Sequence, residues 1–162
     1  MTKPPEPGDP GTYRSVGQNR ELPDRWSRDS EALLKRPSPA VLTSYRKDGT
    51  ASVSHVWFRL HDHGLEVVIA EGDVKLRHLE RVPRCSLVVF ETLPPFRSLI
   101  VEGSPRLEPD VDNRARLAIA SRYLGAEVAR RFVEERQTPG LVLRITATTV
   151  KEWDLSGIPP QE

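Results

Sequence analysis

The sequence predicts an α+β domain in which six antiparallel strands close into a small barrel. Short segments alternate apolar and polar residues, as strands with one buried face do. Turn signals separate these segments, and the strongest is Asp48-Gly49, because Asp-Gly favours two-residue hairpin turns. Two helical segments interrupt the strands, a short one after the third strand and a long one before the sixth. We expect a barrel because closure removes unpaired strand edges.

The domain is predicted to cover residues 25–156, with both ends of the chain outside it. Residues 1–24 are rich in proline and glycine and poor in apolar side chains, so burial cannot offset the entropy lost on ordering. We expect them to form a flexible arm or to wrap a partner subunit, and residues 157–162 to form a C-terminal tail. The domain begins with a short helix over 26–36, which is followed by prolines that end it.

Each of the six strands is expected where apolar and polar residues alternate between turn signals. The predicted ranges are 40–46, 51–60, 65–71, 85–91, 98–107 and 141–153. In the second strand, Val53, His55 and Trp57 face one way because side chains alternate along a strand. In the fifth, Gly103 and Pro105 indicate a bulge.

Two further helices complete the domain. The short one follows Asp73 and ends before Pro83. The long one covers 110–137, with its apolar residues on one side, and Gly125 is the point at which it bends or divides. Its many charged side chains, Arg116 among them, are interpreted as a solvated face.

The composition excludes several classes of protein. The chain has 24 basic and 23 acidic residues, for a formal charge of +1, whereas generic nucleic-acid-binding proteins carry a basic surplus. Cys85 is the single cysteine, which excludes an internal disulfide and is typical of a reducing compartment. No apolar run approaches the ~20 residues of a membrane span, and no signal-peptide segment is recognisable. We expect a soluble cytoplasmic protein that binds neither nucleic acid nor membrane.

Lys75, Arg77 and His78 gather at the start of the short helix, where acidic side chains are normally favoured. Backbone N–H groups at a helix N-terminus attract anions, and phosphate is their usual ligand. The cluster therefore either binds an anionic ligand or is a solvated basic turn beside acidic residues. Leu76 packs inward in both cases.

His55 and Trp57 share one face of the second strand and either line a ring-shaped ligand or belong to the core. His61 and His63 stand in a turn without further ligands, so no metal site is predicted. The sequence has no Ser/His/Asp spacing and no paired carboxylates, and we predict no catalytic nucleophile. Cys85 enters an apolar strand and is expected to be buried rather than reactive.

The order of these elements resembles the pyridoxamine 5′-phosphate oxidase-like split-barrel flavoproteins. It is most similar to the branch that uses the deazaflavin coenzyme F420. The segments that carry the resemblance are AVLTSYRKDGTASVSHVWF, KLRHLERVPRCSLVV and VEGSPRLEPD, and the resemblance covers about residues 40–153. The residues by which the true oxidase binds pyridoxal phosphate are not evident, so vitamin B6 oxidation is not predicted.

The resemblance implies a Greek-key-like split barrel and a homodimer that holds FMN or F420 in a cleft between its subunits. Such a cofactor would pass hydride to or from a small organic substrate, and the protein would supply binding and electrostatics. Matched by position, the cofactor-binding residues implied are Ser54, His55, Val56 and Trp57 beside the ring, Ile69 and Ala70 at the phosphate-bearing tail, Lys75 on the phosphate, and Leu76 and His78 near it.

The sequence departs from this family just before the lysine, where Glu71, Asp73 and Val74 stand at positions that often carry Arg or Ser. Carboxylates beside a phosphate oppose its binding unless they cap the helix, and Asp73 is placed to be the N-cap. Two functions therefore stay open. One is an oxidoreductase that uses F420 or FMN, and the other is a non-catalytic protein that binds a flavin, F420 or haem for storage or sensing.

Overall fold

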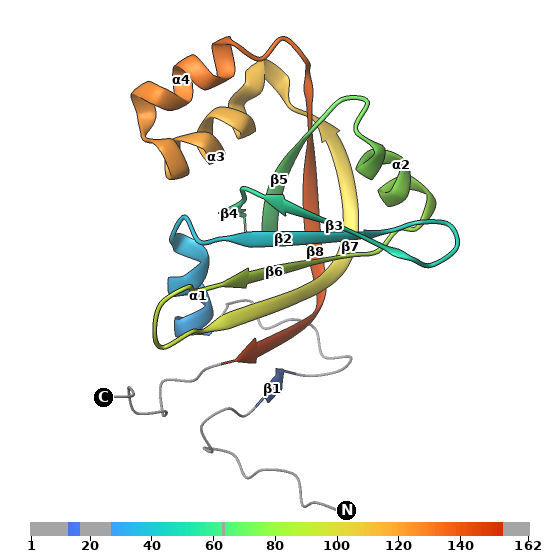
Figure 1. Cartoon of the computed structure of the whole chain (residues 1–162), viewed down its shortest axis with the longest axis vertical. Coiled ribbons are helices and arrows are strands. Elements are labelled where there is room, and N and C mark those ends of the chain that lie inside the picture. Colours follow the sequence, from blue (N-terminus) through green and yellow to red (C-terminus); the bar gives the residue numbers. More distant parts are fainter. Residues whose placement is uncertain (1–12, 17–26, 63, 154–162) are drawn as a thin grey trace, which may run out of the picture.

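A computed structural model describes residues 13–16, 27–62 and 64–153 of the chain. Its strands form one antiparallel sheet, in which seven follow the order β3-β2-β6-β7-β8-β5-β4 and the eighth, β1, pairs with β8 (Figure 1). The strands are β1 (Tyr13–Val16), β2 (Ala40–Tyr45), β3 (Ala51–Val56), β4 (Arg59–His61), β5 (Gly64–Ala70), β6 (Cys85–Phe90), β7 (Ser98–Pro109) and β8 (Gly140–Trp153). The helices are α1 (Arg28–Lys35), α2 (Val74–Arg81), α3 (Arg114–Leu124) and α4 (Ala126–Glu134), with a 3-10 turn over Val111–Asn113.

The prediction of six strands is wrong, although the α+β class and the antiparallel sheet are confirmed. The predicted strand over 51–60 is two strands, β3 and β4, which lie at opposite ends of the strand order. Between them Phe58 is fully buried and its backbone N–H lies 3.4 Å from the Tyr123 hydroxyl oxygen, so the chain leaves one ladder and enters another. Alternation of side chains continues through this point, which is why the sequence pattern did not reveal the change of partner.

The predicted N-terminal arm lies outside the described residues except for β1. Its four residues pair with Val150–Trp153 at the end of β8. Backbone pairing needs no apolar side chains, and composition alone therefore did not indicate this strand. Trp26 and the predicted C-terminal tail also lie outside the described residues.

The predicted long helix is divided, as the position of Gly125 indicated. Gly125 has φ +80° and ψ 159°, and it ends α3 and begins α4. A residue without Cβ adopts this conformation at little cost, so the chain can change direction here. The two helices lie together over one end of the sheet and contact β5 through α3 (Figure 1).

The core lies inside the curved sheet and is closed by α1 and α2. Alternate residues of the strands point inward, and the fully buried ones are mainly leucine and valine. They include Leu42, Leu65, Leu87, Leu99, Val101 and Leu143. The predicted bulge is confirmed in β7 at Glu102/Gly103, and a Cβ on Gly103 would lie 2.3 Å from the Thr146 carbonyl oxygen. Only glycine therefore allows β7 and β8 to approach each other at this point.

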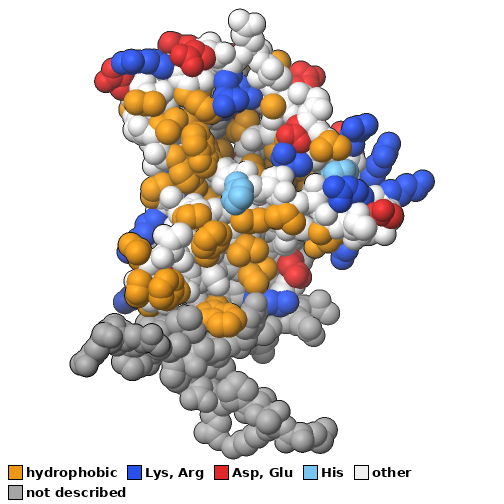
Figure 2. All heavy atoms as spheres, viewed as in Figure 1, with side chains coloured by type: hydrophobic (Ala, Val, Ile, Leu, Met, Phe, Trp, Pro, Cys, Tyr) orange, Lys and Arg blue, Asp and Glu red, His pale blue; other side chains and the backbone are white. Residues whose placement is uncertain are grey.

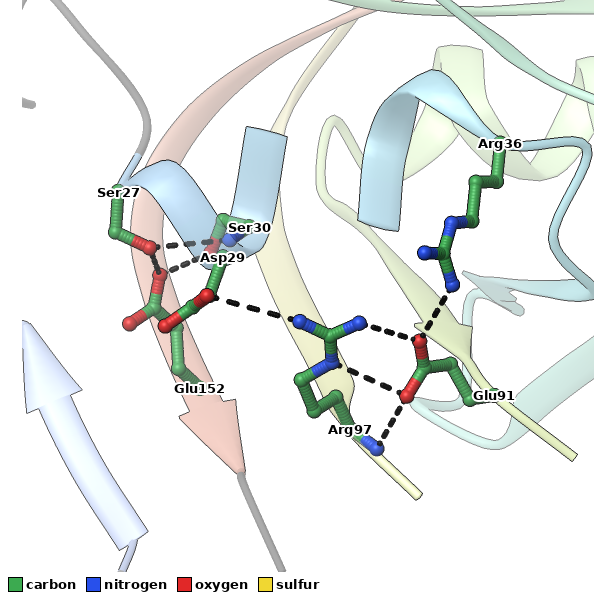
Figure 3. Close-up of polar contacts among 7 residues, drawn as sticks. All are labelled: Ser27, Asp29, Ser30, Arg36, Glu91, Arg97 and Glu152. Atoms are coloured by element: carbon green, nitrogen blue, oxygen red, sulfur yellow. Dashed lines mark hydrogen bonds and ion pairs between the residues drawn. The ribbon is translucent and has the colours of Figure 1, made fainter. Parts of the chain in front are cut away.

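Hydrogen bonds and ion pairs hold α1 against the strands (Figure 3). Ser27 caps the helix by accepting a hydrogen bond of 3.1 Å from the Ser30 N–H, and both hydroxyls donate to the Glu152 carboxylate of β8. At the other end of this network, the Arg97 guanidinium binds both oxygens of Glu91, at 2.7 and 3.1 Å. The network joins α1, β8 and the β6–β7 connection.

Candidate functional site

The start of α2 is organised by Asp73, which is the N-cap as the sequence predicted. One carboxylate oxygen accepts from the Lys75 backbone N–H at 2.9 Å, and the other lies 2.7 Å from the Lys75 Nζ. Partial burial raises the pKa of Asp73, but the hydrogen bonds and charge of Lys75 lower it more, so its pKa lies below the ordinary value. The basic turn is therefore partly neutralised from within the chain.

Lys75 stays available for a ligand in spite of this pairing. Its side chain is 19% exposed, so it is neither buried in the core nor extended into open solvent. An ammonium group has three N–H donors, and Asp73 takes one of them. His78 lies one turn further along α2, and its Nδ1 is 3.3 Å from the hydroxyl of the buried Ser44 in β2. The imidazole is thus held against the sheet, on the same helix as Lys75.

Two of the predicted cofactor residues point into the core instead of toward a ligand. Ile69 is 3% exposed and Leu76 is 8% exposed, and both belong to the main hydrophobic cluster. They could meet a cofactor only through their backbone. Ala70, next to Ile69, is exposed at the end of β5.

The structure places Ser54, His55 and Val56 on β3, which ends the strand order, and Trp57 directly after it. No described strand pairs with the outer side of β3, so one row of its backbone N–H and C=O groups is free to meet a ligand. Burial alternates along β3, with His55 and Trp57 on the exposed side and Val56 packed against the core. This confirms the prediction that His55 and Trp57 face the same way.

Trp57 also belongs to a second feature, a cavity of about 210 Å³ between β5 and the α3–α4 pair. Its ring stacks on Tyr123 with centroids 5.2 Å apart, and Phe132 of α4 lies 5.4 Å away. We call this cavity the arginine–aromatic pocket, and its lining residues are Trp57, Val68, Ala70, Arg116, Ile119, Phe132 and Arg136. Two of the predicted cofactor residues, Trp57 and Ala70, thus lie in one pocket, whereas Lys75 and His78 do not line it.

Arg116 was assigned to a solvated helix face, and that assignment is wrong. It is only 7% exposed, and its Nη1 donates to the Asn113 Oδ1 at 3.1 Å and to the Thr138 carbonyl at 2.9 Å. Gly140 leaves room for it, since a Cβ there would lie 2.8 Å from the Arg116 Nη2. The signal was present in the sequence, because Arg116 precedes Ile119 and Tyr123 by three and seven residues and so shares their buried stripe.

Arg136 is the second cation of the pocket and follows the end of α4. Its guanidinium carbon lies 4.1 Å from the centroid of the Phe132 ring. A guanidinium over an aromatic face is a favourable but weak arrangement, and it leaves the planar edge of the group able to bind an anion. No pattern in the sequence indicated Arg136 as a site residue.

Other candidate groups do not form a reactive site in the described part of the chain. Cys85 is buried, as predicted, and its burial raises its pKa to about 12, so the thiol is inert at neutral pH. Within residues 13–16, 27–62 and 64–153, no three metal-ligating side chains come together, and His63 lies outside these ranges. None of the helices described there is both long and apolar enough to cross a membrane.

The family model for pyridoxamine 5′-phosphate oxidase matches residues 28–154, which is most of the chain. This chain belongs to that family. The match begins at α1 and ends just after β8, so it contains α2, β3 and the arginine–aromatic pocket. The resemblance carried by the sequence motifs is therefore confirmed. A search of curated proteins finds no match for this family member.

Solved structures support the same fold. The conserved hypothetical protein Rv2991 of Mycobacterium tuberculosis is similar with a TM-score of 0.71 at 20% identity, over 90% of this family member and 96% of that chain. An F420 reductase is similar with a TM-score of 0.62 at 25% identity, over 74% of this chain and 94% of the reductase chain. The haem storage protein HutZ of Vibrio cholerae is similar with a TM-score of 0.59 at 17% identity, over 82% of this chain and 99% of the HutZ chain. One architecture thus serves proteins with different ligands.

Proposed function

We propose that this protein is an oxidoreductase that binds F420 or FMN between two copies of the chain and exchanges hydride with a small organic substrate. The observation that carries the proposal is the placement of Lys75. It stands at the start of the helix that follows β5, partly exposed and anchored by the N-cap Asp73. Membership of the pyridoxamine 5′-phosphate oxidase family and the similarity to an F420 reductase support a flavin or deazaflavin as the ligand.

The charges around α2 fit the phosphate of such a cofactor. Figure 2 shows Lys and Arg side chains gathered over α2 and the β2–β3 hairpin. Asp73 already occupies the Lys75 backbone N–H, so the phosphate would bind the Lys75 ammonium rather than the helix N-terminus itself. Charge-assisted hydrogen bonds of this kind contribute about 1.5–3 kcal/mol each.

The exposed face of the sheet fits a second copy of the chain. Val41, Val53, Val88 and Ile100 lie on this face, and the strand register places Val41 beside Val88 and Val88 beside Ile100. Figure 2 shows hydrophobic side chains in a band over this part of the molecule. A contiguous apolar patch on a protein surface marks an interaction site, and we propose that a second protomer covers it and completes the cofactor cleft.

In this proposal the cofactor, when bound, supplies the hydride chemistry. The chain holds the cofactor tail with Lys75 and offers the free edge of β3 and the exposed side of His55 and Trp57 to the ring. Covering the cleft with a second protomer would exclude water from the reacting groups. No protein nucleophile is required.

A non-catalytic binding protein is the second candidate, and the Asp73–Lys75 ion pair favours it. The 2.7 Å contact neutralises part of the charge that a phosphate would use, and a weaker phosphate site suits a ligand held by ring contacts, such as haem. A Soret band in the spectrum of the loaded protein would identify haem as the ligand. For a protein loaded with FMN or F420, oxidation or reduction of the bound cofactor by added organic substrates would separate the oxidoreductase from the non-catalytic binder.

The decisive experiment titrates F420 and FMN separately into the purified protein and into two variants. Lys75→Ala should weaken binding of the preferred cofactor at least tenfold, because one phosphate contact is lost. Arg81→Ala, which removes an exposed cation from the last turn of the same helix, should leave the affinity unchanged. Equal affinities of wild type and Lys75→Ala would remove Lys75 from the site. Sedimentation should show a dimer, and a monomer at micromolar concentration would contradict the shared cleft.

A further inference from the structure

We propose that the arginine–aromatic pocket binds a small planar organic anion, namely an aromatic or conjugated carboxylate. Two guanidinium groups supply the charge, and two aromatic rings supply flat walls. Identifying this anion as the substrate rests on the proposed function, whereas its binding does not.

The residues that line the pocket include two arginines and no carboxylate. Among the described residues, no carboxylate forms an ion pair with Arg116 or Arg136 within 4.0 Å. The carboxylate of Asp110 caps α3 instead, and it accepts from the backbone N–H groups of Ala115 at 2.8 Å and Arg116 at 3.0 Å. Burial is the largest effect on the pKa of Arg116 and lowers it. The charge of Asp110 raises this pKa and the charge of Arg136 lowers it, and the net result is a pKa below the ordinary value. An anion between the two guanidinium groups would relieve this unfavourable arrangement.

The buried position of Arg116 gives the anion a fixed partner. Its Nη1 is held by Asn113 and Thr138, and Gly140 allows the rest of the guanidinium to lie close to the backbone of β8. A guanidinium held in one orientation matches the two oxygens of a carboxylate, which favours bidentate binding. Arg136 is exposed at the opening, where it can attract the anion.

The walls and the size of the pocket select a flat ligand with about one ring. The rings of Trp57 and Phe132 contact each other, with centroids 5.4 Å apart and planes tilted by 46°, and form one aromatic side of the pocket, while Val68 and Ile119 add aliphatic contacts. A cavity of about 150 Å³ can hold benzene, so a cavity of about 210 Å³ accommodates a ring with a carboxylate. Drug-sized ligands need roughly 300 Å³ or more. Inorganic phosphate would satisfy the charge but leave the aromatic walls without a partner.

The location places this anion next to the proposed cofactor. Trp57 continues directly from β3, the strand proposed to run beside the cofactor ring, and Ala70 ends β5 four residues before α2 begins. Both residues line the pocket. A ligand there would lie between β5 and the α3–α4 pair, beside the end of β3 that is proposed to meet the cofactor ring.

Isothermal titration of the full chain with benzoate, benzamide and inorganic phosphate tests the proposal. Benzoate should bind with a Kd on the order of 1 mM and at least tenfold more tightly than the neutral benzamide, because the carboxylate meets both arginines. Phosphate should bind more weakly than benzoate. Equal affinity for benzoate and benzamide, or no saturation by benzoate, would overturn the proposal.

Matched variants locate the binding. Arg136→Gln should weaken benzoate binding about tenfold and leave benzamide unchanged, while Arg130→Gln, an equal charge change on the exposed side of α4, should alter neither. The benzoate affinity of Arg136→Lys should lie between those of wild type and Arg136→Gln, since lysine keeps the charge but lacks the planar guanidinium group. If Arg136→Gln binds benzoate like wild type, the pocket is not the site.

The same titrations separate this proposal from the proposed function. Lys75→Ala should lose cofactor affinity and keep benzoate affinity. A protein that binds benzoate in the pocket but neither F420 nor FMN overturns the oxidoreductase and keeps the anion site. A protein that binds a cofactor but not benzoate overturns the anion site and keeps the oxidoreductase.

Discussion

Two groups of arginines in this protein differ in what neutralises them. Arg97 lies between two carboxylates, with Glu91 at 2.7 Å and Asp29 at 3.6 Å, and Arg36, the residue directly after α1, binds the same Glu91 (Figure 3). In the arginine–aromatic pocket, Arg116 and Arg136 line one cavity, and neither forms an ion pair with a described carboxylate. The first group joins α1 to the sheet. The comparison shows that Arg97 and Arg36 are neutralised within the fold, whereas the two pocket arginines keep a charge that the proposed anion would neutralise.

Lys75 lies between these extremes. It has a counterion, Asp73, but that carboxylate also caps α2 and leaves the ammonium partly exposed. Such a group can hold the helix start in the free protein and share its charge with a phosphate when one binds. Substitutions of Glu91, Asp73 and Arg136 test this ordering.

Glu91→Gln should have the largest effect on folding. Glu91 is largely buried beside Arg97, and the substitution removes the negative charge and one of the two oxygens that accept from that guanidinium. We expect a loss of about 2 kcal/mol in the free energy of unfolding, measured by urea denaturation at pH 7. A loss below about 0.5 kcal/mol would show that the network does not hold α1.

The pH dependence of this loss has a definite sign. Hydrogen bonds from Arg97 lower the pKa of Glu91, which outweighs the opposing effect of burial. The carboxylate therefore stabilises the fold above its unfolded pKa of about 4.3, and this stabilisation disappears as the pH falls through the lower folded value. The difference between wild type and Glu91→Gln should shrink below pH 4.3, and a difference that grows there would contradict the assignment.

Substitutions of Asp73 should have an intermediate effect. Asp73→Ala removes the cap and should cost about 1 kcal/mol of stability, whereas Asp73→Asn keeps a capping oxygen and should cost only a few tenths. Asp73→Asn also releases the charge of Lys75, so the affinity for a phosphate-bearing cofactor should rise, as measured by titration. A fall in affinity would mean that Asp73 itself contributes to cofactor binding.

Arg136→Gln should have the smallest effect on folding. It removes no ion pair within the described residues and relieves repulsion with Arg116, so the free energy of unfolding should change by less than about 0.5 kcal/mol. Thermal and urea denaturation measure this. Destabilisation as large as that of Glu91→Gln would remove the contrast between the two arginine groups.

Much of the local architecture could be predicted from the sequence. Asp73 as N-cap, Gly125 as a helix boundary and the bulge at Gly103 each depend on the chemistry of one residue and its neighbours. The Lys75 region was recognised for the same reason, because a basic turn at a helix start departs from a local rule. Leu76 is buried, as the sequence predicted, whereas the burial of Ile69, which was included by its position in the motif, shows that such a position does not fix which way a side chain points.

The sequence by itself determined most of the strand and helix segments, the N-cap Asp73, the helix boundary at Gly125 and the family. Only the tertiary structure decided that 51–60 serves two ladders, that β1 joins β8, and that Arg116 and Arg136 face one cavity with Trp57. The physical reason is range. Periodicity and capping act over a few residues, whereas strand partners and charge neutralisation depend on groups that folding brings together from distant parts of the chain.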